Sequence, residues 1–430
     1  MASLLLLFVG TFIFAVSALA FFKPKYVFFL LLVSRPIIDH FGSLKEISLP
    51  FLGTNAIQAI GVFLPFILIL SCFLKKLDVA HRDIFFFRER LANYYLLFVL
   101  ACIPALLVSA QPVLHLGDWL KFLTLWAIFV FAHNFLETEE DFRQAMFWVI
   151  IGSLYPLGMF LIDFVTGNTV RIGGLLRILG GYYQEKNIFA ADLLTCFVPA
   201  YLYYLVVIRR TLVTWLIGLG FVFLIVCIAA TNFRTSIAAA LIMCLCFLLF
   251  RKKYTAVLTM VAVTVCAFLV MPELREKFYP ALAALLSIGD LMSTRPTISD
   301  PLISTRFGIF RTLITTVLHR FSVGNFITGY GYALPLKSFW VDSAHMEFLQ
   351  LFFRYGVLPA LLFYWFLLAT LRRGFRCRED ELCQVIMAFI VGLTFVSLMG
   401  NPFSNVRVLW YLGVYVAILS KRSCAERASC

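Results

Sequence analysis

The sequence predicts an all-α polytopic membrane protein with about 12–13 transmembrane helices and one large extracytoplasmic loop that carries amphipathic helices. Of the 430 residues, 62% are hydrophobic and only 14% are charged, whereas a soluble domain is nearer half apolar and about a quarter charged. The mean hydropathy is +0.94. Apolar runs of about 20 residues, the length that lets a helix cross a bilayer, recur along the whole chain.

Apolar runs define the candidate membrane spans in chain order. They cover residues 2–21, 25–38, 55–74, 92–110, 118–136, 143–165, 187–208, 211–230, 235–250, 254–271, 345–370, 384–400 and 405–420. The first run has no basic segment before it and is followed by further apolar runs. We therefore interpret it as a membrane helix and not as a cleaved signal peptide.

Basic residues in the connecting segments predict the orientation. Alternate segments hold more than half of the 36 lysines and arginines. These segments are Lys23–Lys25, 75–90, Glu137–Arg143, Arg209–Arg210, Arg251–Lys253, Arg372–Arg378 and Lys421–Arg427. Basic residues accumulate on cytoplasmic loops, so thirteen spans place the N-terminus outside and the C-terminus inside. Twelve spans with both ends inside is the alternative, because Lys23 and Lys25 are a weak orientation signal.

The same charge pattern explains the net charge of +13. We therefore expect no nucleic-acid partner.

The chain divides into N-terminal transmembrane helices (1–271), a large polar loop (272–344), and C-terminal transmembrane helices with a short cytoplasmic tail (345–430). Within the loop, two segments with apolar residues at helical spacing flank a turn-rich stretch. We expect these segments to form amphipathic helices on the membrane surface.

The eleven cysteines predict neither a disulfide framework nor a zinc site. Seven fall in apolar runs, four lie in or beside basic segments, and none lies in the long loop. No Cys/His spacing typical of zinc ligands is present.

Arg234 is the first candidate functional residue. It lies in TNFRTS, a short polar break between two apolar runs. An arginine this close to hydrocarbon is costly and often marks a function, although an arginine at a helix end can also extend its charge to the membrane surface. Arginine binds phosphate oxygens through planar, bidentate hydrogen bonds.

Arg306 and Arg311 lie on the second amphipathic segment of the loop. They are five positions apart, so they point about 140° apart around a helix axis and cannot face one ligand without distortion. Arg306 follows Ser304-Thr305, a plausible N-cap, and helix N-termini favour anions. Attraction to anionic lipid headgroups is the alternative role for both arginines.

His345 lies where the long loop returns to apolar sequence. Asp342 precedes it by three residues and Glu347 follows it by two. A histidine with a pKa near neutrality is the usual general base for activating a hydroxyl. An interfacial histidine without a chemical role is the alternative.

Arg177, Lys186 and Asn187 are candidate substrate-binding residues on the same predicted side. They lie in RIGGLLRILGGYYQEKN, whose glycines would let a ligand approach the backbone. The GYG at Gly329–Gly331 is not a potassium filter, because it lies in a long basic loop without the flanking filter sequence.

The chain resembles the O-antigen ligase and O-antigen polymerase superfamily of bacterial envelope glycosyltransferases. The resemblance rests on RILGGYYQEKNIFAADL, TNFRTSIAAALI, STRFGIFRTL, GYGYALPL and AHMEFLQLFFRYGVLPALLFY, in that order, and on one large periplasmic loop before the last helices. It implies a bacterial inner-membrane protein whose active site faces the periplasm. By this resemblance Arg234 and Arg306 match the two arginines, and His345 the histidine, that surround a lipid-linked diphosphate.

The resemblance also implies the reaction. A glycan on undecaprenyl diphosphate would be transferred, with inversion, to a hydroxyl of a glycan or of lipid A–core. The arginines would stabilise the diphosphate leaving group, and His345 would take the proton. We expect substrate contacts from Arg177, Lys186, Asn187, Arg311, Asp342 and Glu347, and no cofactor or metal.

Polymerase is slightly preferred over ligase. Family ligases tend to carry Asn, Ser or Gln straight after the histidine, then nine residues, a glycine, and a small or aromatic residue three positions further on. This chain has Gly356 in place, but it has Met346 after the histidine and Pro359 at the last position. A lipid-linked oligosaccharide flippase or other transporter is the alternative from a different class. Such proteins usually show internal pseudo-symmetry and spans broken near mid-membrane.

Overall fold

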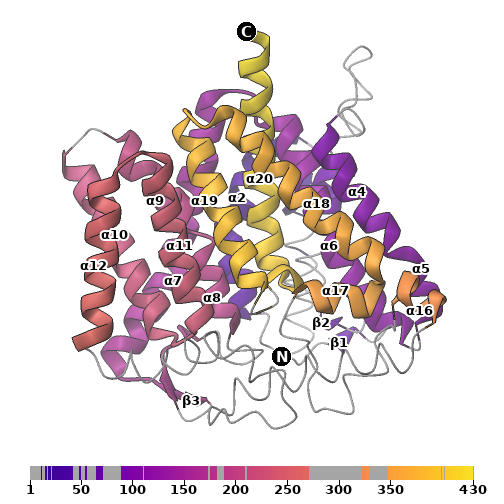
Figure 1. Cartoon of the computed structure of the whole chain (residues 1–430), viewed down its shortest axis with the longest axis horizontal. Helices are drawn as coiled ribbons and strands as arrows, with labels where there is room; N and C mark the ends of the chain where they lie inside the picture. The colour runs from indigo at the N-terminus through magenta and orange to yellow at the C-terminus, as the bar shows by residue number, and fades with distance from the viewer. Residues whose placement is uncertain are drawn as a thin grey trace.

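A computed structural model describes residues 11, 15–16, 18–20, 22–41, 48–49, 54–55, 64–70, 89–109, 111–172, 175–181, 188–208, 211–270, 322–329, 347–398, 400 and 402–429. Within them the chain is overwhelmingly helical (Figure 1). The predicted all-α class is confirmed for this part of the chain, apart from two short hairpins. The predicted loop 272–344 lies outside the described residues except for 322–329, and so do most of the predicted spans 2–21 and 55–74.

The helices of the described residues follow the predicted spans closely. They are α2 (Pro24–Phe41), α4 (Arg90–Ala101), α5 (Ile103–Val108), α6 (Pro112–Phe135), α7 (Glu139–Thr166), α8 (Ile188–Thr195), α9 (Val198–Val207), α10 (Thr211–Ala230), α11 (Arg234–Phe250), α12 (Tyr254–Val270), α16 (Val323–Thr328), α17 (Glu347–Tyr355), α18 (Val357–Gly374), α19 (Glu381–Ser397) and α20 (Val406–Ser429). Short 3-10 helices, η5 (Phe375–Cys377) and η6 (Pro402–Ser404), follow α18 and precede α20.

Six helical segments in the described part are long and apolar enough to cross a bilayer. They are Arg90–Val108, His115–Phe135, Glu139–Thr166, Ala190–Val207, Leu212–Ala230 and Val357–Cys377. The chain is therefore a helical, membrane-associated protein, as its composition predicts. Shorter apolar helices at Arg234–Phe250, Tyr254–Cys266 and Glu381–Ser397 add to the same bundle.

Two predicted spans are not continuous helices, which corrects the sequence-based boundaries. The span 187–208 is interrupted at Cys196–Phe197, between α8 and α9. Pro199, in the first turn of α9, has no N–H to donate to the preceding turn. The span 345–370 is broken at Gly356, where φ is +95°, a backbone conformation that ends α17 and turns the chain into α18.

Local sequence defines the ends of α7, the longest helix of the described residues. Its N-terminus carries a capping box in which Thr138 and Asp141 each bond to the other's backbone N–H. Acidic residues fill its first turn, where they complement the helix dipole. The helix ends at Gly167, whose φ of +66° closes the last turn.

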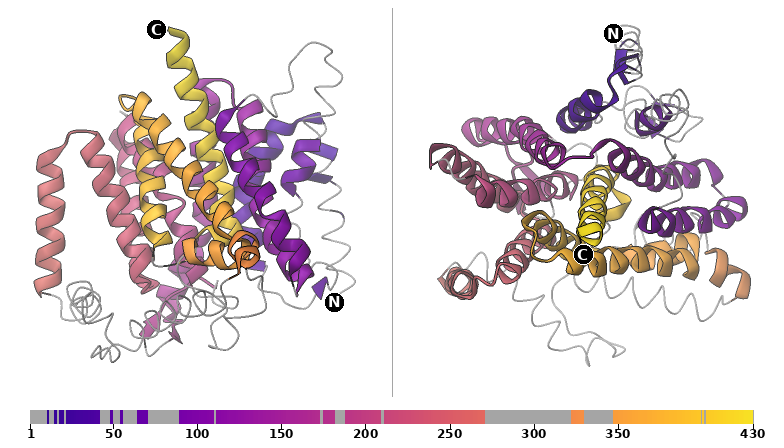
Figure 2. Two further views of the ribbon diagram at one scale, coloured as in Figure 1. Left: turned by 45° about the vertical axis from the view of Figure 1, so that its right-hand side comes forward. Right: turned by 90° about the horizontal axis from the view of Figure 1, so that it is seen from above.

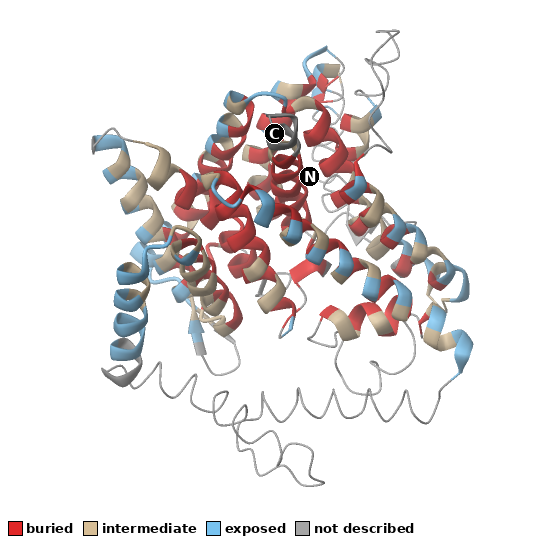
Figure 3. Ribbon diagram, turned by 45° about the horizontal axis from the view of Figure 1, so that its top comes forward, coloured by how far each residue is buried: buried red, intermediate tan, exposed pale blue. Residues whose placement is uncertain are grey.

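The buried core surrounds α20, which runs through the middle of the bundle and packs along α6 (Figures 1 and 2). Figure 3 shows buried residues concentrated around this centre and exposed residues along α12 at the periphery. Large aromatic side chains fill the core, among them Trp410, Tyr411 and Tyr415 of α20. On α10 the apolar side chains of Trp215 and Leu216 are exposed, as expected of residues that face lipid.

Ion pairs gather residues from several predicted cytoplasmic segments at one end of the bundle, here called the basic end. Arg251 pairs with Glu381 (Nη1–Oε1 2.9 Å) and Arg422 with Asp380 (Nη2–Oδ2 3.1 Å). Further ion pairs join Lys25 to Asp141, Arg373 to Glu89 and Arg422 to Glu139. These segments therefore share one end of the molecule, as the charge pattern predicts. Which side of a membrane this end faces stays a prediction.

The opposite end, here called the site end, holds short irregular elements (lower part of Figure 1). They include α16, α17, η6 and two antiparallel hairpins, β1 (Ser48–Leu49) with β2 (Thr54–Asn55) and β3 (Val170–Ile172) with β4 (Leu175–Arg177). In the second hairpin Val170 lies opposite Arg177 and Ile172 opposite Leu175. The sequence did not predict these strands, because each is only two or three residues long.

Candidate functional site

The structure describes three of the residues that the sequence singles out: Arg177, Arg234 and Glu347. It brings the first two together and places the third on a separate helix. The other candidates lie outside the described residues, namely Lys186, Asn187, Arg306, Arg311, Asp342 and His345. Their predicted roles stay predictions.

Arg234 is the first residue of α11, directly after a tight turn from α10. The turn consists of Thr231, Asn232 and Phe233. Asn232 has φ +58°, a left-handed conformation that asparagine adopts more readily than most residues. Its side-chain amide donates to the Leu176 carbonyl at 2.7 Å. The turn is thereby tied to β4, and Arg234 is held at the N-terminal end of a long helix, where the helix dipole favours an anion.

Arg177 ends β4 and lies against the same turn. The next residue, Ile178, donates its N–H to the Ala230 carbonyl at 3.1 Å. The Arg177 guanidinium stacks over the Phe233 ring, 4.2 Å from the centroid, in a cation–π contact. Its Nε and Nη1 atoms are buried and find no hydrogen-bond partner among the described residues.

Arg177 and Arg234 form a pair of neighbouring cations, here called the arginine pair. Burial, and secondarily the charge of Arg234, lower the pKa of Arg177 below its usual value. Arginine nevertheless stays protonated at physiological pH. Two adjacent positive charges repel each other, so an anion between them would relieve the repulsion and satisfy the unused donors of Arg177.

A buried ionic network lies beside the arginine pair and was missed by the sequence analysis. Asp39 of α2 is paired bidentately by Arg35 (Nε–Oδ2 3.0 Å, Nη2–Oδ1 2.8 Å) and also by Arg407 of α20 (Nε–Oδ2 3.1 Å). Asp192 of α8 accepts a hydrogen bond from Ser236 of α11 at 3.4 Å. The positive charge of Arg407 also interacts electrostatically with the Asp192 carboxyl group.

A signal for this network exists in the sequence. Arg35, Asp39, Asp192 and Arg407 all interrupt apolar runs, and ionisable residues in such runs mark functional or paired sites. Each is less than a tenth exposed. Arg35 and Asp39 are four residues apart on one helix, but Arg407 comes from a helix far away in the sequence, so its pairing with Asp39 could not be read from the chain.

Glu347 begins α17 and faces the protein interior. Its side chain is 0% exposed, and its Oε2 accepts the backbone N–H of Phe403 in η6 at 3.0 Å. In this conformation the carboxylate supports the fold of the site end. Its role in substrate binding stays a prediction.

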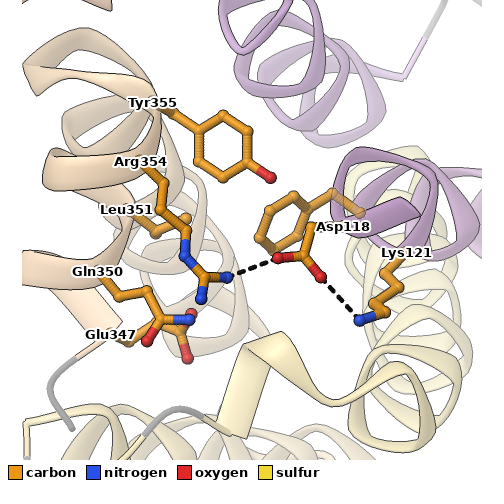
Figure 4. Close-up of a pocket in the computed structure, with 8 residues that line it drawn as sticks. Asp118, Lys121, Glu347, Gln350, Leu351, Arg354 and Tyr355 are labelled. Carbon is orange, nitrogen blue, oxygen red and sulfur yellow. Dashed lines mark hydrogen bonds and ion pairs between the residues drawn. The ribbon is translucent and has the colours of Figure 1, made fainter. Parts of the chain in front are cut away.

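α17 is also tied to α6 by an ion pair (Figure 4). Arg354 contacts Asp118 (Nη1–Oδ2 2.5 Å), and Asp118 also pairs with Lys121 (Oδ1–Nζ 2.7 Å). These residues, with Glu347 and Gln350, line a cavity of about 10 Å³, which is room for about one water molecule. This cavity is therefore too small for a substrate, whereas the arginine pair lies in the surface elements of the site end.

Two glycines fix α16 against the junction of α17 and α18. A Cβ at Gly356 would lie 1.8 Å from the Ile327 carbonyl oxygen, and one at Gly329 would lie 2.6 Å from the Arg354 carbonyl carbon. The backbones can approach this closely only because both residues lack a side chain.

Comparison with known proteins adds no relative. No family model matches the chain, and no curated protein matches it at the significance threshold of the search.

Proposed function

We propose that the chain is a glycosyltransferase of the O-antigen ligase and polymerase type, acting at the periplasmic face of the bacterial inner membrane. The donor would be a glycan on undecaprenyl diphosphate and the acceptor a hydroxyl of a second glycan, with polymerisation preferred over transfer to lipid A–core. The observation that carries the proposal is the arginine pair. It gathers two cations and two unused buried donors at the end of the bundle opposite the basic end.

The arginine pair suits a diphosphate group. Arg177 keeps its planar donors oriented by stacking on Phe233, and a preoriented guanidinium binds phosphate oxygens bidentately. Arg234 adds its charge at the start of α11. In the proposed reaction Arg306 would join them, so that the charge on the departing diphosphate meets cations that are already in place.

The proposed chemistry is a direct displacement. The acceptor oxygen attacks the anomeric carbon and forms the new glycosidic bond, while the bond from that carbon to the diphosphate oxygen breaks with its electron pair. His345 takes the acceptor proton as general base. Attack from the face opposite the leaving group inverts the anomeric configuration.

The experiment is acceptor-dependent transfer by purified protein in liposomes that contain undecaprenyl diphosphate carrying a glycan. Longer glycans on the same lipid would identify a polymerase, and glycan on added lipid A–core would identify a ligase. Both arms are run with and without EDTA. We expect product in both conditions because the proposal assigns charge stabilisation to arginines. Absence of product with every acceptor would contradict the proposal.

A lipid-linked oligosaccharide flippase is the second candidate. The buried network of Arg35, Asp39, Asp192 and Arg407 favours it, since ionisable groups inside membrane helices often line transport pathways. The break between α8 and α9 is also a feature of transporters. Translocation of a fluorescent lipid-linked glycan in the same liposomes, without transfer, would support this candidate over the enzyme.

A further inference from the structure

Arg177 lies on a short segment of chain whose position determines where its guanidinium points. This segment, residues 175–181, is here called the β4 segment, and it ends in a glycine turn made of Gly180 and Gly181. The two glycines have φ values of +55° and +77°, a left-handed conformation that other residues rarely adopt. The glycine turn therefore gives the chain a defined change of direction shortly after β4.

The first part of the β4 segment is fastened to the α10–α11 turn. The Leu176 carbonyl accepts from Asn232 at 2.7 Å, and the Ile178 N–H donates to a carbonyl at the end of α10 at 3.1 Å. Between these two contacts the Arg177 guanidinium lies over the Phe233 ring, 4.2 Å from its centroid. Both hydrogen bonds lie next to Arg177, so the far end of the segment is fixed by other contacts.

The far end of the β4 segment packs against α2 and α7 through the glycine turn. A Cβ at Gly180 would lie 2.5 Å from Cδ2 of Phe160 on α7, and one at Gly181 would lie 2.4 Å from Cε1 of His40 on α2. Both rings lie so close to the glycine backbone that only residues without a side chain fit between them. The sequence predicts room for a ligand at these glycines, whereas in the structure two protein rings occupy that space.

The two rings are themselves held in place. Phe160 is fully buried in the core. His40 lies in the last turn of α2 and packs edge-on against Tyr155 of α7, with ring centroids 5.7 Å apart and an interplanar angle of 88°. Side chains packed at the density of a protein interior cannot move aside without opening a void. The rings are therefore a firm surface on which the glycine turn rests.

We propose that His40 and Phe160 are positioning residues for Arg177, which they hold in place through the glycine turn and the β4 segment. This inference rests on the proposed function for the identity of the ligand, a diphosphate group. Neither ring touches the substrate in this role. A planar guanidinium binds phosphate oxygens bidentately only when it is correctly oriented, so a displaced β4 segment would weaken binding at Arg177.

Binding of inorganic pyrophosphate to the full-length protein in lipid nanodiscs provides the first test. Gly181→Ala adds a Cβ that overlaps the His40 ring, and His40→Ala removes the ring from the other side of the same contact. Gly167→Ala is the matched control, because Gly167 has a similar φ of +66° but nothing within 4 Å of the added Cβ. His40→Phe keeps a ring at this place and removes the imidazole nitrogens.

We expect Gly181→Ala and His40→Ala each to raise the Kd for pyrophosphate roughly 10-fold, the effect of losing about one hydrogen bond to a charged group. The double variant should lose less affinity than the two single variants together, because both substitutions act on one contact. Gly167→Ala and His40→Phe should bind pyrophosphate as the unaltered protein does. Fully additive losses in the double variant, or equal losses in Gly181→Ala and Gly167→Ala, would overturn the inference.

A distance measurement separates the positioning of Arg177 from the identity of its ligand. Spin labels carried by genetically encoded amino acids replace Leu176 on β4 and Leu161 on α7, whose side chains are 58% and 52% exposed. We expect His40→Ala to broaden or shift the distribution of distances between them, and an unaltered distribution would overturn the inference. So would a His40→Phe protein that keeps the distance but binds pyrophosphate weakly, because that result would make His40 a ligand of the phosphate.

These measurements also cover the two ways in which the first test could fail. If Gly181→Ala does not fold, His40→Ala supplies both the Kd and the distance on its own. If the unaltered protein binds no pyrophosphate, the proposed function loses its diphosphate site. The distances alone then decide whether the glycine turn holds the β4 segment against α2 and α7.

Discussion

Arg177 shows at the scale of one residue how a cation is prepared for a ligand. Its guanidinium is oriented by Phe233 and Arg234 lies beside it, yet two of its buried nitrogens have no hydrogen-bond partner in the described part of the chain. Leaving buried donors unused is costly. The cost is explained if a diphosphate occupies this position during the proposed reaction.

Substituting Arg177 should therefore weaken the binding of the lipid donor. We expect Arg177→Gln to raise the Kd for undecaprenyl diphosphate roughly 10- to 100-fold, since a hydrogen bond to a charged group is worth about 1.5–3 kcal/mol. Arg177→Lys should restore little of this, because an ammonium group can neither bind bidentately nor stack as a guanidinium does. Titration of the lipid into liposomes that contain each variant provides the measurement, and full recovery with lysine would contradict this explanation.

Gly356 is a second residue whose role follows from its geometry. Its φ is +95°, and a Cβ would lie 1.8 Å from the Ile327 carbonyl oxygen. We expect Gly356→Ala to lower the free energy of unfolding by more than about 1 kcal/mol through backbone strain and overlap. Gly158→Ala, inside α7 with nothing within 4 Å of the added Cβ, is the matched control and should be neutral or slightly stabilising. Equal melting temperatures for the two variants would contradict this prediction.

At the scale of elements, α17 is a short amphipathic helix held by contacts with three other elements. It contacts α6 through Arg354 and Asp118, η6 through Glu347, and α16 through the paired glycines. Hydropathy alone merged α17 with α18, because glycine does not interrupt an apolar run. The positive φ of Gly356 separates the two helices. Glycine permits this backbone conformation but does not require it, so the residue type alone did not predict the break.

The Arg354–Asp118 pair gives a prediction at this scale. The two side chains are 9% and 12% exposed. Removing the Asp118 charge takes a carboxylate away from the nearly buried Arg354 guanidinium, and breaking a buried pair from one side typically costs about 3–5 kcal/mol. We expect Asp118→Asn alone to lower the melting temperature more than the double variant Asp118→Asn with Arg354→Met does. If the double variant loses as much stability as the two single variants together, the two side chains are not energetically coupled.

At the scale of the whole molecule, the apolar runs predicted most helices because hydrophobicity and length are properties of contiguous sequence. The charge pattern likewise predicted which segments share the basic end, where Arg251 meets Glu381 and Arg422 meets Asp380. The interior network was not predicted, since Arg407 and Asp39 meet across 368 residues. In the candidate site, Arg234 was predicted because it lies in a polar break between two apolar runs. Its proximity to Arg177 was not predicted, because it depends on how the β3–β4 hairpin packs on the α10–α11 turn.

The orientation of the molecule gives a further prediction. Leu176 lies on the site end and is 58% exposed, whereas Arg378 follows η5 at the other end with a 70% exposed side chain. In intact cells of a bacterial host with a permeable outer membrane, a charged thiol reagent should label Leu176→Cys and should not label Arg378→Cys. The reverse pattern would place the arginine pair in the cytoplasm and contradict periplasmic transfer.

In the proposed reaction, the arginine pair stabilises a diphosphate during glycan transfer. Transfer from undecaprenyl diphosphate glycan by Arg234→Gln, compared with Arg378→Gln, tests it most directly, because both variants lose one positive charge and only the first touches the site end. We expect Arg234→Gln to lower kcat/KM at least about 100-fold, the typical effect of removing one group that stabilises transition-state charge, and Arg378→Gln to retain the activity of the unaltered protein. Equal activities in the two variants, both correctly folded, would contradict the claim.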